Sequence, residues 1–183
     1  MAPARQRIID AALTLVSEQG LSRVTMIEIA RTANVSRQTL YNHFPDIPSI
    51  LTEAAAHHNA AATAGLEQAL AVVQAPSDKI RQIVIHVAAI STHGGHTLQS
   101  HAALPPDLRE QLSGFDEALE QQLRRALHDG VEQGEFSADL TVETDAVLLR
   151  HALGGLSELV AASPDDAADL VAETARTVLA ALR

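Results

Sequence analysis

Histidine supplies much of the possible chemistry in this 183-residue sequence, which holds nine histidines and no cysteine. Eight of the nine lie after residue 50, where their ring nitrogens could bind a metal ion or hydrogen-bond a ligand. His93 and His96 have the i, i+3 spacing that can chelate a metal on an unbroken helix, but Gly94 and Gly95 lie between them. Because neither a cysteine nor a nearby carboxylate completes the set, we expect no bound metal and no other cofactor.

A cavity lined by some of these histidines is the interpretation that we favour. Residues 82–106 contain no Asp, Glu, Lys or Arg, but histidine, glycine, hydroxyl and amide residues interrupt their apolar pattern. This stretch is therefore predicted to line a pocket and not to cross a membrane. A ligand that is apolar but carries hydrogen-bonding groups suits it better than a strong anion. The alternative is that these side chains are ordinary core or surface residues. The predicted ligand-binding residues are His86, Ile90, His93, Phe115 and His151.

A second set of polar side chains lies near the N-terminus. Ser36 is a good N-cap for a short helix from Arg37 to His43, and Leu40 and Phe44 are expected to face the core. Helical spacing then turns the other side chains of this helix towards solvent. The outward-facing residues are predicted to be Arg37, Gln38, Tyr41 and Asn42.

Guanidinium, amide and phenol groups on one exposed helix are suited to contact DNA bases and phosphates. We predict that Arg37 and Gln38 read base edges and that Tyr41 and His43 bond phosphate. The alternative is that Tyr41 only packs between helices and that Ser36 only caps. The predicted DNA-binding residues are Thr25, Ser36, Arg37, Gln38, Thr39, Tyr41, Asn42 and His43.

The helices that must position these groups are marked by their ends. Apolar residues at i, i+3 and i+4 spacing predict a helix from Ala4 to Gln19. Thr25 and Glu28 form a capping box at the start of a second, short helix. Asn34 tolerates positive φ and indicates a tight turn before the third helix. Two short helices joined in this way form a helix-turn-helix, whose second helix enters the major groove of DNA.

The net charge of −10 argues against a nucleic-acid partner, but the charge is unevenly distributed. Residues 1–50 hold five arginines against four acidic residues, whereas the remainder holds eight basic and nineteen acidic residues. Arg5, Arg7 and Arg23 could add positive charge near the predicted DNA contacts. Because phosphate contacts need Lys or Arg, only the N-terminal part is suited to bind DNA. The sequence therefore predicts two functional halves.

The order of residues in the N-terminal part closely resembles the signature of the TetR family of bacterial transcriptional regulators. The resemblance is carried by Ile9, Ala12 and Gly20 and by the run Thr25-x-x-x-Ile29-Ala30-x-x-Ala33-Asn34-Val35-Ser36-x-x-Thr39-Leu40-Tyr41-x-His43-Phe44, within about the first fifty residues. It implies an all-helical dimer that binds DNA through these helices and a small ligand through a variable C-terminal domain.

Two departures from the family pattern affect DNA binding. Asn34 replaces the usual glycine of the turn, which the left-handed tendency of asparagine should tolerate. Ile47 stands near the start of the fourth helix, where the family usually has a lysine that meets the DNA backbone. With one phosphate contact missing, we expect weak non-specific binding and a shallow salt dependence.

Only four residues are aromatic, so Ala, Leu, Val and Ile must build the core, a composition that favours closely packed helices. We predict an all-α fold of about nine helices. Residues 1–46 form a three-helix DNA-binding domain, and residues 47–183 form a ligand-binding and dimerisation domain. Gly65, among the small residues of the fourth helix, leaves room for another group to approach. The later helices are expected from Asp46 towards Val73 and over residues 78–92, 97–103, 107–133, 142–162 and 165–182.

The last two predicted helices carry more apolar surface than one small domain needs, with Gly154 and Gly155 between the apolar residues of the first. We predict a homodimer through these two helices, packed as a four-helix bundle about a two-fold axis. A dimer presents two DNA-reading helices to a palindromic operator. The alternative is that these faces pack only within one chain.

These observations predict a cytoplasmic repressor that a small molecule releases from its operator by changing the tilt of the fourth helix. The N-terminal segment is amphipathic and does not resemble a secretory signal. A competing hypothesis is a ligand sensor or protein-interaction module of the same fold with weak or lost DNA binding, since Lys79 is the only lysine. Catalysis is not expected, because the run Gly155-Leu156-Ser157-Glu158-Leu159 lacks the second glycine of a nucleophile elbow and lies in a predicted helix.

Overall fold

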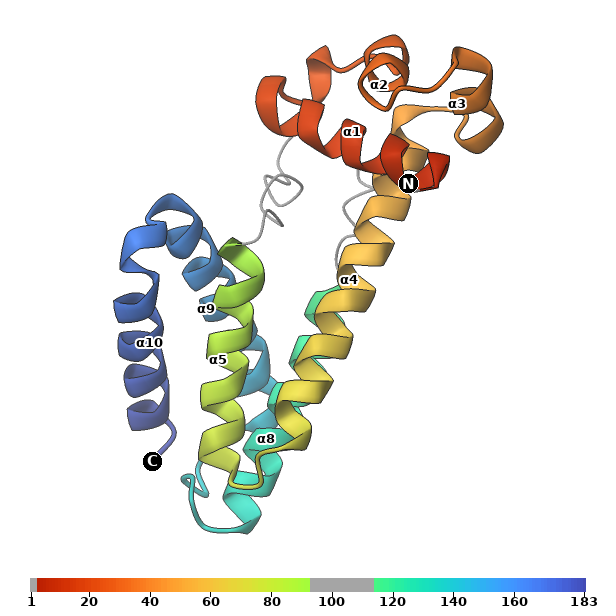
Figure 1. Cartoon of the computed structure of the whole chain (residues 1–183). Coiled ribbons are helices and arrows are strands. Elements are labelled where there is room, and N and C mark those ends of the chain that lie inside the picture. Colours follow the sequence, from red (N-terminus) through yellow and green to blue (C-terminus); the bar gives the residue numbers. More distant parts are fainter. Residues whose placement is uncertain (1–2, 93–113) are drawn as a thin grey trace. The chain divides into compact units, whose positions relative to one another are not determined.

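The structure, a computed structural model, describes residues 3–92 and 114–183, and every regular element in these ranges is helical (Figure 1). The predicted all-α fold class is confirmed. None of the described helices is long and apolar enough to cross a membrane. The predicted helix over residues 97–103 and the predicted start at residue 107 lie outside the described residues. The α-helices are α1 (Ala4–Gln19), α2 (Met26–Thr32), α3 (Arg37–His43), α4 (Ile47–Ala71), α5 (Pro76–Thr92), α8 (Gly114–Glu132), α9 (Val142–Ala162) and α10 (Ala167–Ala181), with 3-10 turns η1 (Leu21–Arg23) and η3 (Pro164–Asp166).

The described chain divides into two compact units, one of residues 3–59 and one of residues 60–92 and 114–183. Helix α4 begins in the first unit and ends in the second. Its first turns pack with the N-terminal helices, since Ile50 and Leu51 are buried in the N-terminal core. The functional boundary between residues 46 and 47 stays a prediction.

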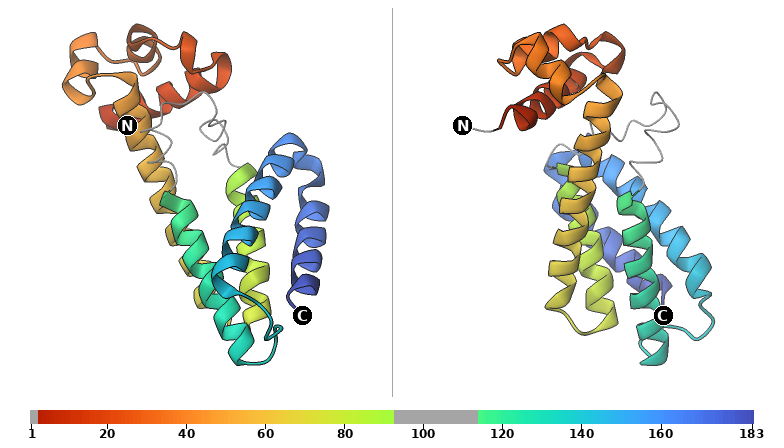
Figure 2. Two further views of the ribbon diagram at one scale, coloured as in Figure 1. Left: turned by 180° about the vertical axis from the view of Figure 1, so that it is seen from behind. Right: turned by 90° about the vertical axis from the view of Figure 1, so that its right-hand side faces the viewer.

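The first unit consists of α1, α2 and α3 gathered around the start of α4 (Figure 2). One residue from each of α1, α2 and α3 is fully buried in the core of this unit, namely Ile8, Ile29 and Leu40. Asp46 caps α4, because its Oδ1 accepts a hydrogen bond from the Ser49 N–H at 2.8 Å. A core shared by all four helices holds α3 in a defined orientation within this unit.

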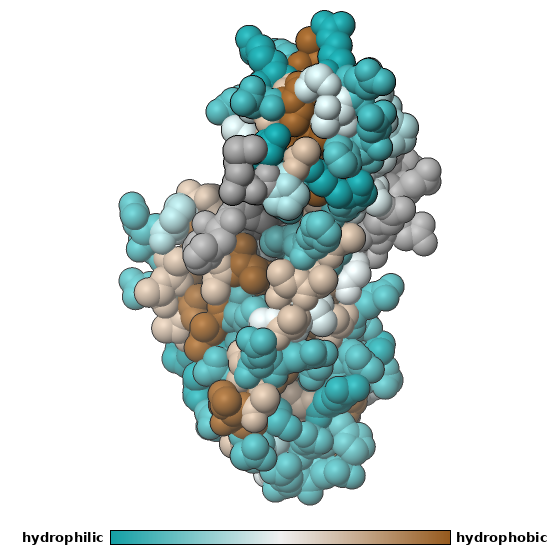
Figure 3. Space-filling model, turned by 45° about the vertical axis from the view of Figure 1, so that its right-hand side comes forward, coloured by the Kyte–Doolittle hydropathy of each residue, from teal (hydrophilic) through white to brown (hydrophobic). Residues whose placement is uncertain are grey.

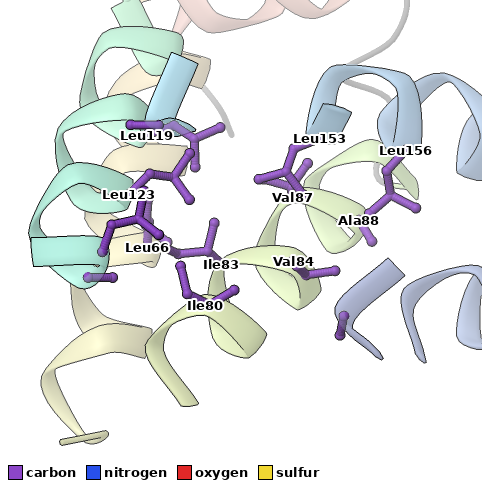
Figure 4. Packing of buried hydrophobic residues seen from close by; sticks show 14 of the residues in the cluster. Leu66, Ile80, Ile83, Val84, Val87, Ala88, Leu119, Leu123, Leu153 and Leu156 are labelled. Carbon is purple, nitrogen blue, oxygen red and sulfur yellow. The ribbon is translucent and has the colours of Figure 1, made fainter. Parts of the chain in front are cut away.

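The second unit packs α5 against α8, α9 and α10. Figure 4 shows aliphatic side chains from α4, α5, α8 and α9 meeting in one cluster, among them Leu66, Ile83, Leu123 and Leu153. Small residues allow closer approach: a methyl group on Gly130 would lie 2.0 Å from the Phe136 ring. The predicted aliphatic core is thus the core that forms.

The guanidinium of Arg5 ties the start of α1 to α4 within the first unit. Its Nε and Nη2 donate hydrogen bonds to the two carboxylate oxygens of Glu53, and it lies 4.5 Å from the centroid of the Phe44 ring. The hydrogen bond from Arg5 is the main cause that lowers the pKa of Glu53, and the same bond raises the pKa of Arg5. The charged form of Glu53 is therefore favoured by folding.

We expect the contribution of this pair to stability to depend on pH. Because the pKa of Glu53 is lower in the folded than in the unfolded protein, the pair stabilises the fold above the unfolded pKa of about 4.3 and loses this effect as pH falls through the folded pKa. Thermal unfolding followed by circular dichroism should therefore separate wild type from Glu53→Gln most at neutral pH, and the difference should disappear in acid. Glu18→Gln, at an exposed position of α1, is the matched control. A difference that stays constant across the pH range would contradict this role for Glu53.

Candidate nucleic-acid interface

A tight turn joins α2 to α3 at residues 33–35. Asn34 has φ +52°, and its N–H donates to the Arg31 carbonyl at 3.1 Å. The Val35 N–H donates to the Ala30 carbonyl at 3.0 Å. Together these two bonds are the Schellman pattern, which ends a helix with one residue in the left-handed region. Asparagine therefore fills the position of the usual glycine, as the sequence predicted.

Side-chain caps define the starts of α2 and α3. Thr25 and Glu28 form the predicted capping box: Thr25 Oγ1 accepts from the Glu28 N–H at 3.3 Å, and Glu28 Oε2 accepts from the Thr25 N–H at 3.0 Å. Ser36 Oγ accepts from the Thr39 N–H at 3.0 Å and lies 2.8 Å from Thr39 Oγ1. These hydroxyls already have partners in the protein, so a DNA phosphate would share them with the caps.

The two faces of α3 divide as helical spacing predicted. Leu40 is fully buried and Phe44 is buried beside it, whereas Tyr41 is 55% exposed. The phenol therefore does not pack between helices of its own unit. Thr39 and His43 are half-buried at the edge of the exposed face. The exposed side chains are Arg37, Gln38, Tyr41 and Asn42, which together form a polar ridge along α3.

Not every arginine of the first unit is available to a phosphate. Arg5 is held by Glu53, and the Arg7 Nε donates to the Ala33 carbonyl at 3.1 Å, so these two cations serve the fold. Arg23 and Arg31 are exposed, as is the arginine of the polar ridge. On the face drawn in Figure 3, hydrophilic surface predominates on the N-terminal helices around a narrow apolar strip. Sequence spacing gave no indication that Arg5 and Arg7 would be used internally.

His86 and Phe115, two of the predicted ligand-binding residues, meet in the second unit. Their ring centroids lie 6.2 Å apart. The His86 Nε2 is 2.9 Å from the Ala62 carbonyl of α4, and its Cε1 would be 2.9 Å from a methyl group placed on Gly65. The group that approaches the small residues of α4 is therefore the imidazole of His86. This contact joins α5 to α4 beside an aromatic wall from α8.

The other predicted ligand-binding residues lie elsewhere or are not described. Ile90 is half-buried and packs against the core of the second unit. His151 is exposed on α9, with its Nδ1 2.8 Å from the Val147 carbonyl of the same helix, so the structure does not bring it to His86. His93 lies outside the described residues. Among the residues that are described, no cluster of three potential metal ligands occurs.

The serine considered as a nucleophile lies within α9. Ser157 is 6% exposed, and its Oγ is 2.7 Å from the Oγ of Ser91 on α5, which in turn donates to the Val87 carbonyl at 2.8 Å. A nucleophile elbow presents its serine at a strand-to-helix turn. Ser157 instead bridges two packed helices as a satisfied buried hydroxyl.

Comparison with known proteins agrees with this arrangement. The family profile described as bacterial regulatory proteins, tetR family, matches residues 8–54. An uncharacterised helix-turn-helix transcriptional regulator of Mycobacterium bovis is 47% identical over 55 residues, which are 30% of this chain and 29% of that protein. The chain thus spans less than a third of that relative's length. The regulator AcrR of Shigella flexneri is 28% identical over 168 residues, covering 84% of this chain and 76% of AcrR.

Solved structures share the whole fold. The fatty acid degradation regulator FadR from Bacillus halodurans superposes with a TM-score of 0.82 at 19% identity, covering 100% of this chain and 98% of that one. AibR, solved in complex with isovaleryl coenzyme A and operator DNA, has a TM-score of 0.72 at 18% identity, covering 94% of this chain and 96% of that one.

The family profile and the solved structures cover different extents of the chain. The family profile covers the helices α2 and α3 whose caps, turn and exposed ridge are described above. The solved structures share the fold of both units, including the helices of the second. Residues 8–54 are therefore similar to the N-terminal domain of the bacterial regulatory proteins of the tetR family, and the whole chain shares its fold with solved regulators.

Proposed function

We propose that this protein is a DNA-binding transcriptional regulator, a repressor that leaves a palindromic operator when a small molecule binds to its C-terminal domain. The observation that carries the proposal is the polar ridge on α3, which is exposed while Leu40 and Phe44 anchor the opposite face in the core. Arginine and amide side chains on such a ridge can make the paired hydrogen bonds by which proteins distinguish bases in the major groove. We place this activity in the cytoplasm.

Relatives support both parts of the proposal. The protein IcaR of Staphylococcus aureus, which is 41% identical over 46 residues, is named as a negative transcriptional regulator of the biofilm operon. AibR was solved with an acyl coenzyme A and with operator DNA. In this chain we assign DNA binding to the first unit and effector binding to the second.

A homodimer would place two α3 helices on the two halves of a palindrome. Helix α9 has an exposed apolar face suited to form it. Leu148 is 61% exposed and Leu159 is 57% exposed, and small residues lie between them on the same face. Large apolar side chains rarely gather on the surface of a monomer unless a partner covers them. The exposed face, which we call the α9 stripe, consists of Leu148, Ala152, Gly155, Leu159 and Ala162.

The effector switch is assigned to His86 and α4. The imidazole contacts the Ala62 carbonyl, fits beside Gly65 and faces Phe115, so it touches α4 and the aromatic wall at once. A ligand that hydrogen-bonds the ring would compete with the Ala62 carbonyl for it. Helix α4 runs from this contact into the first unit. A change in the tilt of α4 would therefore alter how the two α3 helices of the dimer fit the half-sites of the operator. The effector is expected to be largely apolar with hydrogen-bonding groups.

A second candidate function keeps the ligand sensor but not the DNA binding. Ile47 is half-buried against the N-terminal core and offers no charge where the family usually has a lysine. Arg5 and Arg7 are bound within the protein, which further reduces the free positive charge. A DNA-binding assay separates the two functions.

We expect wild-type protein to shift a duplex taken from the DNA flanking its own gene, and Arg37→Ala to bind this duplex at least about tenfold more weakly, because a paired contact to a base contributes roughly 1–3 kcal/mol. Binding is measured by electrophoretic mobility shift at several salt concentrations. Arg125→Ala, an exposed arginine of α8, is the matched control and should bind as wild type does. If Arg37→Ala keeps full affinity, α3 is not the reading helix. If wild type binds no tested duplex, the sensor function is favoured.

We expect Leu159→Glu to convert the dimer to a monomer, since it places a charge in the α9 stripe of both copies. Sedimentation velocity should show the dimer dissociation constant rising at least about a hundredfold, because each buried leucine contributes about 1.5–3 kcal/mol. Val72→Glu is the control, since Val72 is 82% exposed and lies outside the stripe. A Leu159→Glu protein that still sediments as a dimer would assign the interface to another face.

We expect Gly65→Ala to weaken DNA binding without any effector. The new methyl group would lie 2.9 Å from His86 Cε1 and must push the ring away from the Ala62 carbonyl, as we propose the effector does. The loss should be at least about fivefold, the lower end of typical coupling between sites. Ala64→Ser, at an exposed position of α4 next to Gly65, is the matched control in the same mobility-shift assay. Unchanged affinity in Gly65→Ala would remove His86 from the switch.

A further inference from the structure

A surface groove lies between α5 and α10 in the second unit. The two helices run antiparallel (Figure 1), and the groove between them has a volume of about 580 Å³. A smaller hollow of about 220 Å³ continues it towards the start of α10 and shares Ile85, Ala168 and Val171 with it. The groove is separate from the contact of His86 with Phe115, because neither ring lines it.

The groove is apolar along its length and cationic at one end. Its walls are alanines with Ile85, Val171 and Leu179, and Ile85 is 40% exposed although it is a large aliphatic residue. Arg81, Arg176 and Arg183 line the end where α5 begins and α10 finishes, and none of the described residues that line the groove is acidic. At the other end, beside Ala88 and Ala167, the lining residues that the structure describes are all uncharged.

Two of these arginines have partners that an incoming anion can replace. Arg81 pairs with Asp78 at 2.6 Å, and Arg176 pairs with Glu173. All four side chains are at least half exposed, and ion pairs in water contribute little to stability. Guanidinium groups bind carboxylates through two parallel hydrogen bonds, which an oriented ligand can use at this end.

We propose that the α5/α10 groove binds an aliphatic carboxylate, with its head at the arginines and its chain along the apolar wall. From Arg81 to Ala89 α5 rises by about 12 Å, which matches an extended chain of about eight to ten carbons. This ligand differs from the effector expected near His86, where residues 82–92 of α5 carry no charged side chain. The site lies within one protomer and does not depend on DNA binding.

Decanoate is the probe that tests this site. Full-length protein carrying ¹³C-labelled isoleucine methyl groups is titrated with decanoate below its micelle concentration, and affinity is measured by calorimetry. We expect the Ile85 methyl resonance to shift with saturation, and decan-1-ol and decyltrimethylammonium to bind at least about tenfold more weakly, because they lack the carboxylate. Equal affinity for the three compounds, or an unperturbed Ile85, would overturn the proposal.

Two sets of variants test separately the contacts of the carboxylate head and of the aliphatic chain of the ligand. The double variant Arg81→Gln with Arg176→Gln should weaken decanoate binding at least about tenfold while leaving decan-1-ol unchanged, and Ala168→Phe should block both ligands by filling the groove. Arg125→Gln is the control for charge, and the methyl spectrum reports whether each variant is folded.

The test also distinguishes this site from the proposed regulatory function. Arg37→Ala and Leu159→Glu should bind decanoate as wild type does, even if DNA binding or dimerisation is lost. If decanoate binds Leu159→Glu but not wild type, or if Ile85 shifts with protein concentration alone, a second copy of the chain occupies the groove and the proposal fails. If Leu159→Glu loses decanoate binding, the site requires the dimer, which also contradicts a site within one protomer.

Discussion

The left-handed residue between α2 and α3 is the constraint on which the N-terminal unit depends. Asn34 at φ +52° allows the chain to reverse within three residues, and the bonds from Asn34 and Val35 to α2 close the turn. Only a residue that tolerates this region can stand there without strain. With the reversal set, Leu40 and Phe44 reach the core and the remaining side chains of α3 are left outside. The exposure of the polar ridge follows from this turn and from the burial of its opposite face.

Small residues play the corresponding part in the second unit. A core with few aromatic residues must be filled by aliphatic side chains from several helices, and alanine and glycine then determine where helices and side chains approach closely. Gly65 leaves space for the imidazole of His86. In the α9 stripe, small residues separate two exposed leucines, and alanines line the open α5/α10 groove. The abundance of small residues thus accounts for the contact of His86 with α4, for the α9 stripe and for the α5/α10 groove.

The chain is acidic overall, and its arginines fall into two groups: some are bound within the protein and others remain exposed. Arg5 and Arg7 hold α1 to its neighbours, so their guanidinium groups are engaged in hydrogen bonds within the protein. The arginines that remain exposed on α2 and α3 are few, which agrees with the expected weak non-specific attraction to DNA. In the second unit, Arg81 and Arg176 lie far apart in sequence but line one end of the same groove. Charge counted along the chain could not separate these uses.

The sequence by itself determined the helical fold class, the capping box at Thr25, the turn at Asn34, the capping of α3 by Ser36 and the two faces of α3. These depend on periodicity and on hydrogen bonds between residues at most five apart, so local pattern is sufficient to predict them. Tertiary structure decided which arginines stay free, that His86 meets Gly65 and Phe115 while His151 does not, and that a groove forms between α5 and α10. Each of these depends on contacts between helices distant in sequence, whose relative rotation is set by packing and is not encoded in any one helix.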